Sequence, residues 1–381
     1  MTRDDMEQGK KLKKRRYYDY TLLFLVLTLT CFGLVMIYSV SYYNANKYYS
    51  DPTLFLRKQA IFAVAGTILM VIISKFDYRL YISRMPVIKI KPIFLLYLLC
   101  MALQLYLVLF GESTGGSQRW INLGPLGKFQ PSEITKICVL LFTAYLVKLA
   151  PRRLDKFRGF LRIMLIMSPL IVLVTLENLS TGIITVVIVV AICFVASRKK
   201  GYYIFCALLF VAFIAVFIIL FPYRSERIDV WRDIENHPKG YQILQGLYAI
   251  ASGGLFGKGL GQGVQKLGYI PEAHNDMIFS VICEELGMVG AFAVLFLFLL
   301  LLWRIFLIAI NAPDLFGSLV ATGVLAHVAV QVLINVSVVT NTIPSTGIPL
   351  PFISYGGTSL LVLMIEMGMV LSISNRIEGE R

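Results

Sequence analysis

The sequence predicts an all-α integral membrane protein with ten transmembrane helices, and two observations carry this prediction. Of the 381 residues, 57% are hydrophobic and only 15% are charged, whereas soluble domains carry about 25% charged residues. The apolar residues gather in runs that repeatedly reach the roughly 20 residues needed to cross a bilayer as a helix. We therefore expect a single polytopic membrane domain over residues 1–381.

Ten apolar runs form the predicted spans. They are Leu22–Tyr42, Gln59–Ser74, Pro92–Phe110, Pro131–Leu149, Leu161–Leu176, Thr181–Ser197, Tyr202–Phe221, Met277–Leu302, Leu315–Thr340 and Tyr355–Ser374. A long connection, residues 222–276, separates the seventh span from the eighth. Connections of this length tend to be functional. Within it, Tyr241–Ser252 is expected to form a short amphipathic helix.

Basic residues in the connections predict the orientation, because short loops rich in Lys and Arg stay in the cytoplasm. With the N-terminus inside, 24 of the 36 lysines and arginines lie inside, 11 lie outside and one, Lys136, lies within a span. Residues 1–20 are then a basic cytoplasmic tail, both termini are cytoplasmic, and residues 222–276 are extracytoplasmic. The net charge of +14 is spread over these loops, so it indicates topology and does not indicate nucleic acid binding.

The six cysteines are scattered, mostly within apolar runs, and show no CxxC spacing. In such positions Cys usually behaves as a small hydrophobic residue. Neither structural disulfides nor a protein-ligated zinc site is expected.

Glu133 and Lys136 lie three residues apart near the start of the fourth predicted span. This spacing places them on one helix face, where they can pair. A charge in the hydrocarbon region costs on the order of 3 kcal/mol if it is unpaired. Two interpretations stay open, a salt bridge that holds the bundle together and a role in a polar cavity.

Asp276 ends the long connection at the mouth of the eighth predicted span. An aspartate directly before a helix can be an N-cap. A carboxylate in the outer aqueous or headgroup zone can also act as a general base. His274 lies two residues earlier and is either a second polar contact or an ordinary interfacial histidine.

Two further segments carry cations beside flexible or aromatic residues. Arg119 can grip a pyrophosphate through its guanidinium or extend to lipid headgroups, and Trp120 fits an interfacial aromatic belt. Residues 253–261 are rich in glycine but lack the spacing of a nucleotide-binding loop. This segment is either a re-entrant or hinge segment or a backbone nest that brings Lys258 near a phosphate.

These segments together resemble the SEDS family (shape, elongation, division and sporulation), which includes the FtsW, RodA and SpoVE proteins. The resemblance covers nearly the whole chain in order. Its motifs are Arg119–Ile121, Phe129–Glu133 with Lys136, Ser252–Gly261, Pro271–Asp276, Glu284–Gly287 and Thr346–Gly357. The last block is somewhat more similar to the division members than to the elongation members.

The resemblance implies a ten-helix fold in the bacterial cytoplasmic membrane, with an active face on the extracytoplasmic side. It implies an inverting peptidoglycan glycosyltransferase that polymerises lipid II, the undecaprenyl-pyrophosphate-linked disaccharide peptide. The family's essential acid–base aspartate matches Asp276, and functionally important positions match Trp120, Glu133 and Lys136. A class B penicillin-binding protein is the implied partner.

The chain departs from the family pattern after the fifth predicted span. Many members have Pro-Asp-Leu-Gly-Thr where this chain has Glu177 to Thr181, with Asn178 in place of the aspartate. Asn178 is uncharged, so it cannot perform a role that needs a charge at that position. Asn275 also replaces the common Thr or Ser, a change that we expect to be tolerated.

The expected reaction needs a base for the acceptor hydroxyl and cations for the leaving pyrophosphate. Asp276 is the predicted base, and Arg119, Lys258 and a divalent cation, Mg²⁺ or Mn²⁺, are the predicted cations. No recognisable motif ligates that ion. Two alternatives are a lipid II flippase, which should show symmetrical broken helices in two halves, and a non-catalytic scaffold for a transpeptidase.

Overall fold

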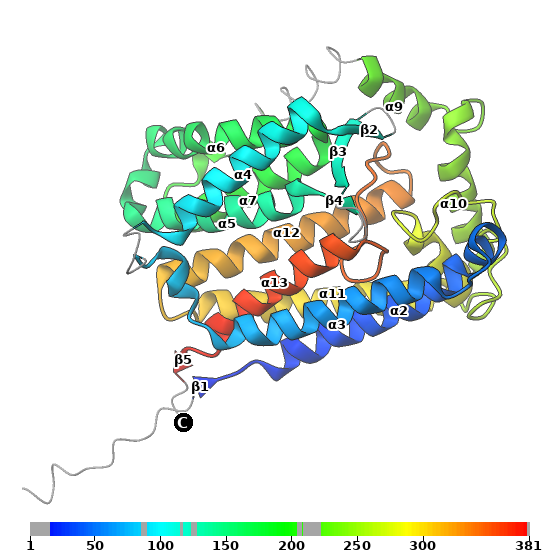
Figure 1. Cartoon of the computed structure of the whole chain (residues 1–381), viewed down its shortest axis with the longest axis horizontal. Coiled ribbons are helices and arrows are strands. Elements are labelled where there is room, and N and C mark those ends of the chain that lie inside the picture. The colour runs from blue at the N-terminus through cyan, green and yellow to red at the C-terminus, as the bar shows by residue number, and fades with distance from the viewer. Residues whose placement is uncertain are drawn as a thin grey trace, which may run out of the picture.

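The computed structural model describes residues 16–84, 90–114, 117–122, 128–203, 208 and 222–378. Long helices lie side by side in a bundle (Figure 1). They are α2 (Tyr20–Tyr49), α3 (Leu54–Lys75), α4 (Pro92–Phe110), α5 (Pro131–Leu149), α6 (Phe157–Glu177), α7 (Leu179–Ala196), α11 (Ile278–Ile310), α12 (Leu315–Val339) and α13 (Gly357–Ser374). In the described part of the chain, eight of them are long and apolar enough to cross a membrane, which makes this a multi-pass membrane protein.

Two of the ten predicted spans, the fourth and the seventh, are not among these eight helices. Helix α5 packs inside the bundle against α4, α7 and α12, although it carries Glu133, Lys136 and Lys148. The seventh predicted span, Tyr202–Phe221, falls almost entirely outside the described residues.

Several helices are longer than the apolar runs predicted. Helix α2 continues past Tyr42 to Tyr49, and α11 ends at Ile310 instead of Leu302. Hydropathy marks only the part of a helix that fits lipid, whereas backbone hydrogen bonding continues into the polar flanks. The predicted bounds at Tyr42 and Leu302 were those of membrane spans, and each lies within its helix.

The first and last described residues of the chain meet at one end of the bundle. Strand β1 (Arg16–Tyr17) pairs antiparallel with β5 (Ile377–Glu378), as Figure 1 shows. Ion pairs reinforce this end, because arginines bind the acidic residues that border the helices. The pairs are Arg304–Asp19 at 2.6 Å, Arg79–Asp314 at 2.8 Å and Arg376–Asp77 at 2.8 Å.

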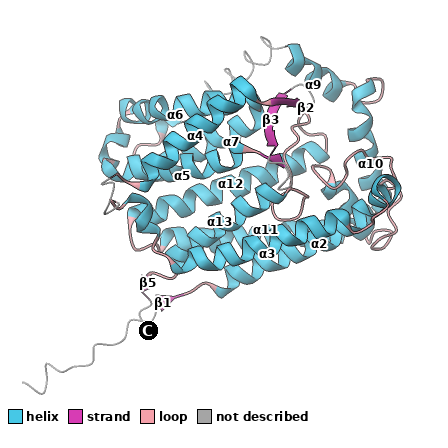
Figure 2. Ribbon diagram, in the orientation of Figure 1, coloured by secondary structure: helices cyan, strands magenta, loops and turns pink. Residues whose placement is uncertain are grey.

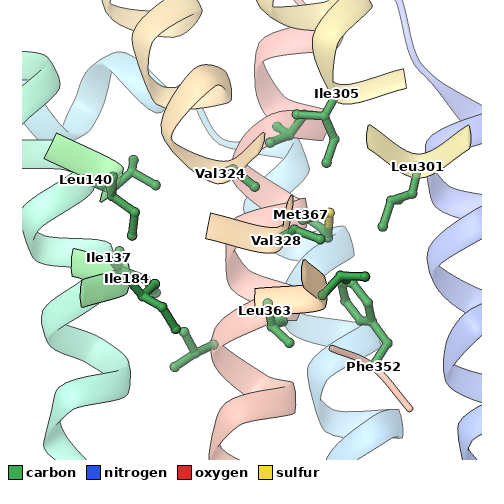
Figure 3. Close-up of a cluster of buried hydrophobic side chains, with 14 of the residues drawn as sticks. Ile137, Leu140, Ile184, Leu301, Ile305, Val324, Val328, Phe352, Leu363 and Met367 are labelled. Carbon is green, nitrogen blue, oxygen red and sulfur yellow. The ribbon is translucent and has the colours of Figure 1, made fainter. Parts of the chain in front are cut away.

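The core lies between α5, α7, α11, α12 and α13. Figure 3 shows Leu140, Val324 and Met367 from three of these helices among its buried side chains. Phe352 joins them from the segment that precedes α13. A side chain at Gly33 of α2 would lie 2.6 Å from the Phe352 carbonyl oxygen, so this glycine lets α2 approach that segment. The bundle core thus reaches into a non-helical segment.

The opposite end of the bundle carries the irregular elements (Figure 2). Helix α9 (Pro222–Arg232), the short η4 (Pro238–Gly240) and α10 (Tyr241–Gly253) come from the long connection. Helix α10 confirms the amphipathic helix predicted at Tyr241–Ser252. The strands β2 (Glu112–Thr114), β3 (Ser117–Asn122) and β4 (Lys128–Phe129) form a small antiparallel sheet that the all-α prediction did not include.

Candidate functional site

Asp276 lies in the turn that leads into α11. The helix begins at Ile278, and no side chain caps its first turn. Asp276 is partly buried, and its carboxylate forms no ion pair within the described residues. The capping interpretation is therefore wrong in this structure, and the carboxylate is available for another role.

Three groups surround the Asp276 carboxylate. The Gln242 side-chain amide of α10 donates to its Oδ1 atom at 3.5 Å, a long hydrogen bond. A Cβ atom at Gly347 would lie 3.9 Å from Oδ2, which places that backbone beside the other oxygen. Burial raises the pKa of Asp276 above its ordinary value, while the nearby Arg227 charge and the Gln242 hydrogen bond oppose this rise.

The segment between α12 and α13, residues 341–356, forms one wall of this site, and we call it the closing segment. It is non-helical, in keeping with its prolines and glycines. From α9, the Arg227 guanidinium donates to the Ser345 carbonyl at 3.0 Å and the Trp231 indole donates to the Asn341 carbonyl at 2.9 Å. The long connection therefore holds the closing segment from one side.

Buried amide side chains hold the closing segment from the other side. On α12, Gln331 donates to the Pro349 carbonyl at 3.0 Å, and Asn335 donates to the Ile348 carbonyl at 2.8 Å. The same amide nitrogen of Asn335 donates to the Asp276 carbonyl, also at 2.8 Å. Asn335 thereby joins the closing segment to the turn that carries the carboxylate.

His274 packs between aromatic rings on the other side of this turn. Its ring centroid lies 4.5 Å from that of Phe55 and 5.4 Å from that of Tyr355. Its carbonyl accepts a hydrogen bond from the Tyr355 amide at 2.9 Å. Burial lowers the pKa of His274 below its ordinary value, so the ring is neutral at pH 7. These contacts favour packing over substrate contact for His274.

The glycine-rich segment 253–266 wraps over a break in α11. Gly287 interrupts this helix with a φ of +67°, and a side chain there would lie 2.3 Å from the Gly257 nitrogen. Just before the break, Glu284 and Glu285 are fully buried. The backbone amides of residues 261, 264 and 265 donate to these two carboxylates. These amides therefore bind carboxylates of the same chain, which argues against the phosphate nest.

Lysines of this segment neutralise both buried carboxylates. The Lys258 amine lies 2.7 Å from Glu284, and the Lys266 amine lies 2.5 Å from Glu285. Ser39 of α2 donates to Glu285 at 2.8 Å. Glu284 thus accounts for the charge of Lys258, and Arg227 is the cation whose charge acts on Asp276.

Glu133 and Lys136 form the ion pair that their spacing predicted. The Lys136 amine lies 3.0 Å from Glu133 Oε1, and both side chains are less than a tenth exposed. The other carboxylate oxygen of Glu133 is buried and has no hydrogen-bond partner among the described residues. One oxygen of Glu133 thus forms the salt bridge, and the other can take part in a polar cavity. Both interpretations of this pair are therefore compatible with the structure.

Further polar groups lie around this pair, between α4, α5 and α6. With its amide group oriented to satisfy both ends, Gln104 of α4 donates to the buried Glu177 carboxylate of α6 and accepts from the Thr135 hydroxyl at 2.9 Å. Strand β3 packs against the same three helices. Trp120 on β3 is half-buried, and the side chain of Arg119 on this strand is outside the described part.

Asn178, which replaces the family aspartate, caps α7. Its side-chain oxygen accepts a hydrogen bond from the Ser180 amide at 3.0 Å. Asparagine and aspartate cap about equally well, so the substitution keeps this structural role.

Sequence reasoning missed Arg227, Gln242, Lys266 and the amides Gln331 and Asn335. The last two offered a signal, because they lie four residues apart on one face of an apolar span. Polar side chains within such spans are rare and usually face the bundle interior. Nothing comparable marks Arg227 among the basic residues of the long connection.

The bundle and the polar groups at one end of it define a multi-pass membrane protein with a candidate site beside its long connection. A family model, described as cell cycle protein and covering FtsW, RodA and SpoVE, matches residues 20–378. The chain belongs to this family.

Individual relatives are similar in sequence to this chain over nearly their full length. Stage V sporulation protein E of Bacillus subtilis is 36% identical over 365 residues, covering 95% of this chain and 98% of the relative. The probable peptidoglycan glycosyltransferase FtsW of Geobacter sulfurreducens is 34% identical over 380 residues, covering 98% of this chain and 100% of the relative.

Two solved structures share the fold. One is a chain from a peptidoglycan synthase complex, described as showing structural coordination of polymerization and crosslinking. Its TM-score to this chain is 0.76. It is 28% identical and covers 94% of this chain and 97% of its own. The rod shape determining protein RodA of Thermus thermophilus matches with a TM-score of 0.68 and 26% identity, covering 95% of this chain and 98% of its own.

Proposed function

We propose that this protein is a peptidoglycan glycosyltransferase that polymerises lipid II, with Asp276 as the general base. The observation that carries the proposal is a partly buried carboxylate that neither caps α11 nor forms an ion pair within the described residues. Its burial and raised pKa are typical of catalytic carboxylates. The relatives named as glycosyltransferases support the same activity.

In the proposed reaction, Asp276 takes the proton of an acceptor sugar hydroxyl as its oxygen attacks C1 of the donor sugar. The new C1–O bond forms on the face opposite the C1–O–P bond, which breaks and releases the lipid pyrophosphate. The configuration at C1 is inverted, and no covalent enzyme intermediate forms. A carboxylate whose pKa is raised is the stronger base for this step.

Cations are needed where the pyrophosphate leaves. Arg227 is the best supported candidate, since its charge already acts on Asp276. Arg119, Trp120, Glu133, Lys136, Lys258 and His274 stay as proposed substrate contacts, with Lys258 and His274 the weakest because of the structural contacts described above. No group of three or more metal-ligating side chains occurs in the described part of the chain. We propose that the Mg²⁺ or Mn²⁺ ion binds through the substrate pyrophosphate.

We further propose the full topology and the partner. Ten transmembrane helices with both termini in the cytoplasm would place Asp276 at the outer face of a bacterial cytoplasmic membrane. The meeting of β1 and β5 at one end of the bundle supports an even number of crossings. A class B penicillin-binding protein is the proposed partner, supported by the match to a chain from a peptidoglycan synthase complex.

Purified protein given lipid II, with and without its transpeptidase partner, tests this function. We expect glycan polymer on a gel and release of the lipid pyrophosphate. Transfer of lipid II between leaflets without polymer would instead identify a flippase. Absence of both activities in the complex with the partner would favour a scaffold.

Replacing Arg227 should change the pH dependence of polymerisation. Because the Arg227 charge lowers the pKa of Asp276, Arg227→Gln should raise that pKa and move the acidic limb of the rate profile to higher pH. Arg227→Lys should keep the limb near its wild-type position. Arg232→Gln, an exposed arginine on the same helix, is the matched control. A limb that does not move in Arg227→Gln would contradict this role.

Exchanging Glu133 and Lys136 separates pairing from a further role of these residues. Removing one partner of a buried pair typically destabilises a protein by about 3–5 kcal/mol, so each single alanine variant should unfold at lower temperature than the double exchange. A folded exchange variant that makes no polymer would show that the site needs each charge at its own position. Full activity of Glu133→Ala would remove Glu133 from the site.

A further inference from the structure

We infer that Asn335 of α12 is a positioning residue that sets the location of the Asp276 carboxylate relative to the closing segment. This inference rests on the function proposed above. Asn335 lies in α12, and the inferred role does not require it to contact the substrate. Its role would be exerted through the backbone of the residue that removes the proton.

The geometry of one amide group carries the inference. The Asn335 nitrogen donates one hydrogen bond to the Asp276 carbonyl and one to the Ile348 carbonyl, each at 2.8 Å. These two carbonyls belong to segments that are separated by the whole of α11 and α12. Asn335 is 1% exposed, so water does not supply alternative partners. The Tyr355 amide also joins the closing segment to this turn, at the His274 carbonyl, but Asn335 is the side chain that binds the backbone of Asp276 itself.

The Asp276 side chain has little else to hold it in place. Its hydrogen bond from Gln242 is long, at 3.5 Å, and the carboxylate forms no ion pair within the described residues. The position of the carboxylate therefore depends on the backbone of its turn. A misplacement of about 1 Å can reduce a rate by about 10²-fold.

Gln331 provides a matched control one helical turn away. Its amide donates to the Pro349 carbonyl of the same closing segment at 3.0 Å, and no bond joins it to the Asp276 turn. Loss of Gln331 tests attachment of the closing segment alone. Loss of Asn335 tests this attachment together with the link to Asp276.

The experiment measures kcat and KM for lipid II polymerisation by the full-length protein with its partner. Asn335→Leu removes both donors at similar size, Asn335→Asp keeps the shape without two donors, and Gln331→Met is the control. We expect kcat to fall by about 10–100-fold in the Asn335 variants, with KM close to wild type. Gln331→Met should keep kcat close to wild type. Thermal unfolding identifies a variant that does not fold, and the remaining Asn335 variant then decides.

Three results would overturn the inference. One is a wild-type kcat in a folded Asn335 variant, and another is an equal loss in Gln331→Met. The third is a further loss when Asn335→Leu is added to Asp276→Asn, because positioning has nothing to act on once the base is absent. Wild-type activity of Asp276→Asn alone would instead refute the proposed base, whatever the Asn335 variants do.

Discussion

Asp276→Asn is expected to reduce lipid II polymerisation by at least about 10²-fold, the lower range for loss of a general base. The amide has nearly the same shape as the carboxylate but no useful proton affinity at neutral pH. The loss should appear in kcat, because the variant removes an interaction of the transition state and leaves substrate contacts in place.

The same substitution should leave the protein as stable as wild type or slightly more stable. Burial raises the pKa of Asp276 in the folded protein, so ionisation at neutral pH costs folding free energy. This cost shrinks as the pH falls through the folded pKa and is gone only below the ordinary aspartate pKa, where both states are protonated. The neutral asparagine avoids it at every pH. Thermal unfolding in detergent measures this effect.

Glu235→Gln is the control for Asp276→Asn. Glu235 lies in the long connection and is exposed, and its loss should leave polymerisation close to wild type. If Asp276→Asn polymerises lipid II as fast as this control, Asp276 is not the base.

Lys266→Met should destabilise the protein by about 3–5 kcal/mol, the range for breaking a buried ion pair. The variant leaves the fully buried Glu285 without its cation, while Ser39 and the Gly261 amide still donate to it. The glycine-rich segment should then loosen from the break in α11. A lower unfolding temperature and faster proteolysis within residues 253–266 would report this change.

An exposed pair provides the comparison for Lys266→Met. Arg57 and Asp51 lie 3.0 Å apart with 63% and 32% of their side chains exposed, and such pairs contribute about 0–1 kcal/mol. Arg57→Gln should therefore unfold close to wild type. Equal stability of Lys266→Met and Arg57→Gln would show that the Lys266 pair does not hold the segment.

The local sequence pattern was sufficient to predict features that depend on a single helix. Apolar runs located the long helices of the bundle, the amphipathic pattern located α10, and the three-residue spacing predicted the Glu133–Lys136 pair. Each of these depends on residues within a few turns of one another. Periodicity and spacing therefore carry the information.

Features that depend on the path of the long connection could not be predicted in this way. The pairing of Lys258 and Lys266 with Glu284 and Glu285 requires the glycine-rich segment to fold back over α11. The approach of Arg227 to Asp276 likewise depends on how α9 meets the closing segment. These contacts leave no periodic signal, because the partners are 19 or more residues apart and irregular backbone lies between them.

The initial rate of lipid II polymerisation as a function of pH tests the central claim most directly. For the wild-type protein, the account predicts an acidic limb above about 3.9, the ordinary aspartate pKa, because burial raises the pKa of Asp276. The residual rate of Asp276→Asn should lack this limb. A limb of the same position in Asp276→Asn would show that another group removes the proton, and would contradict the account.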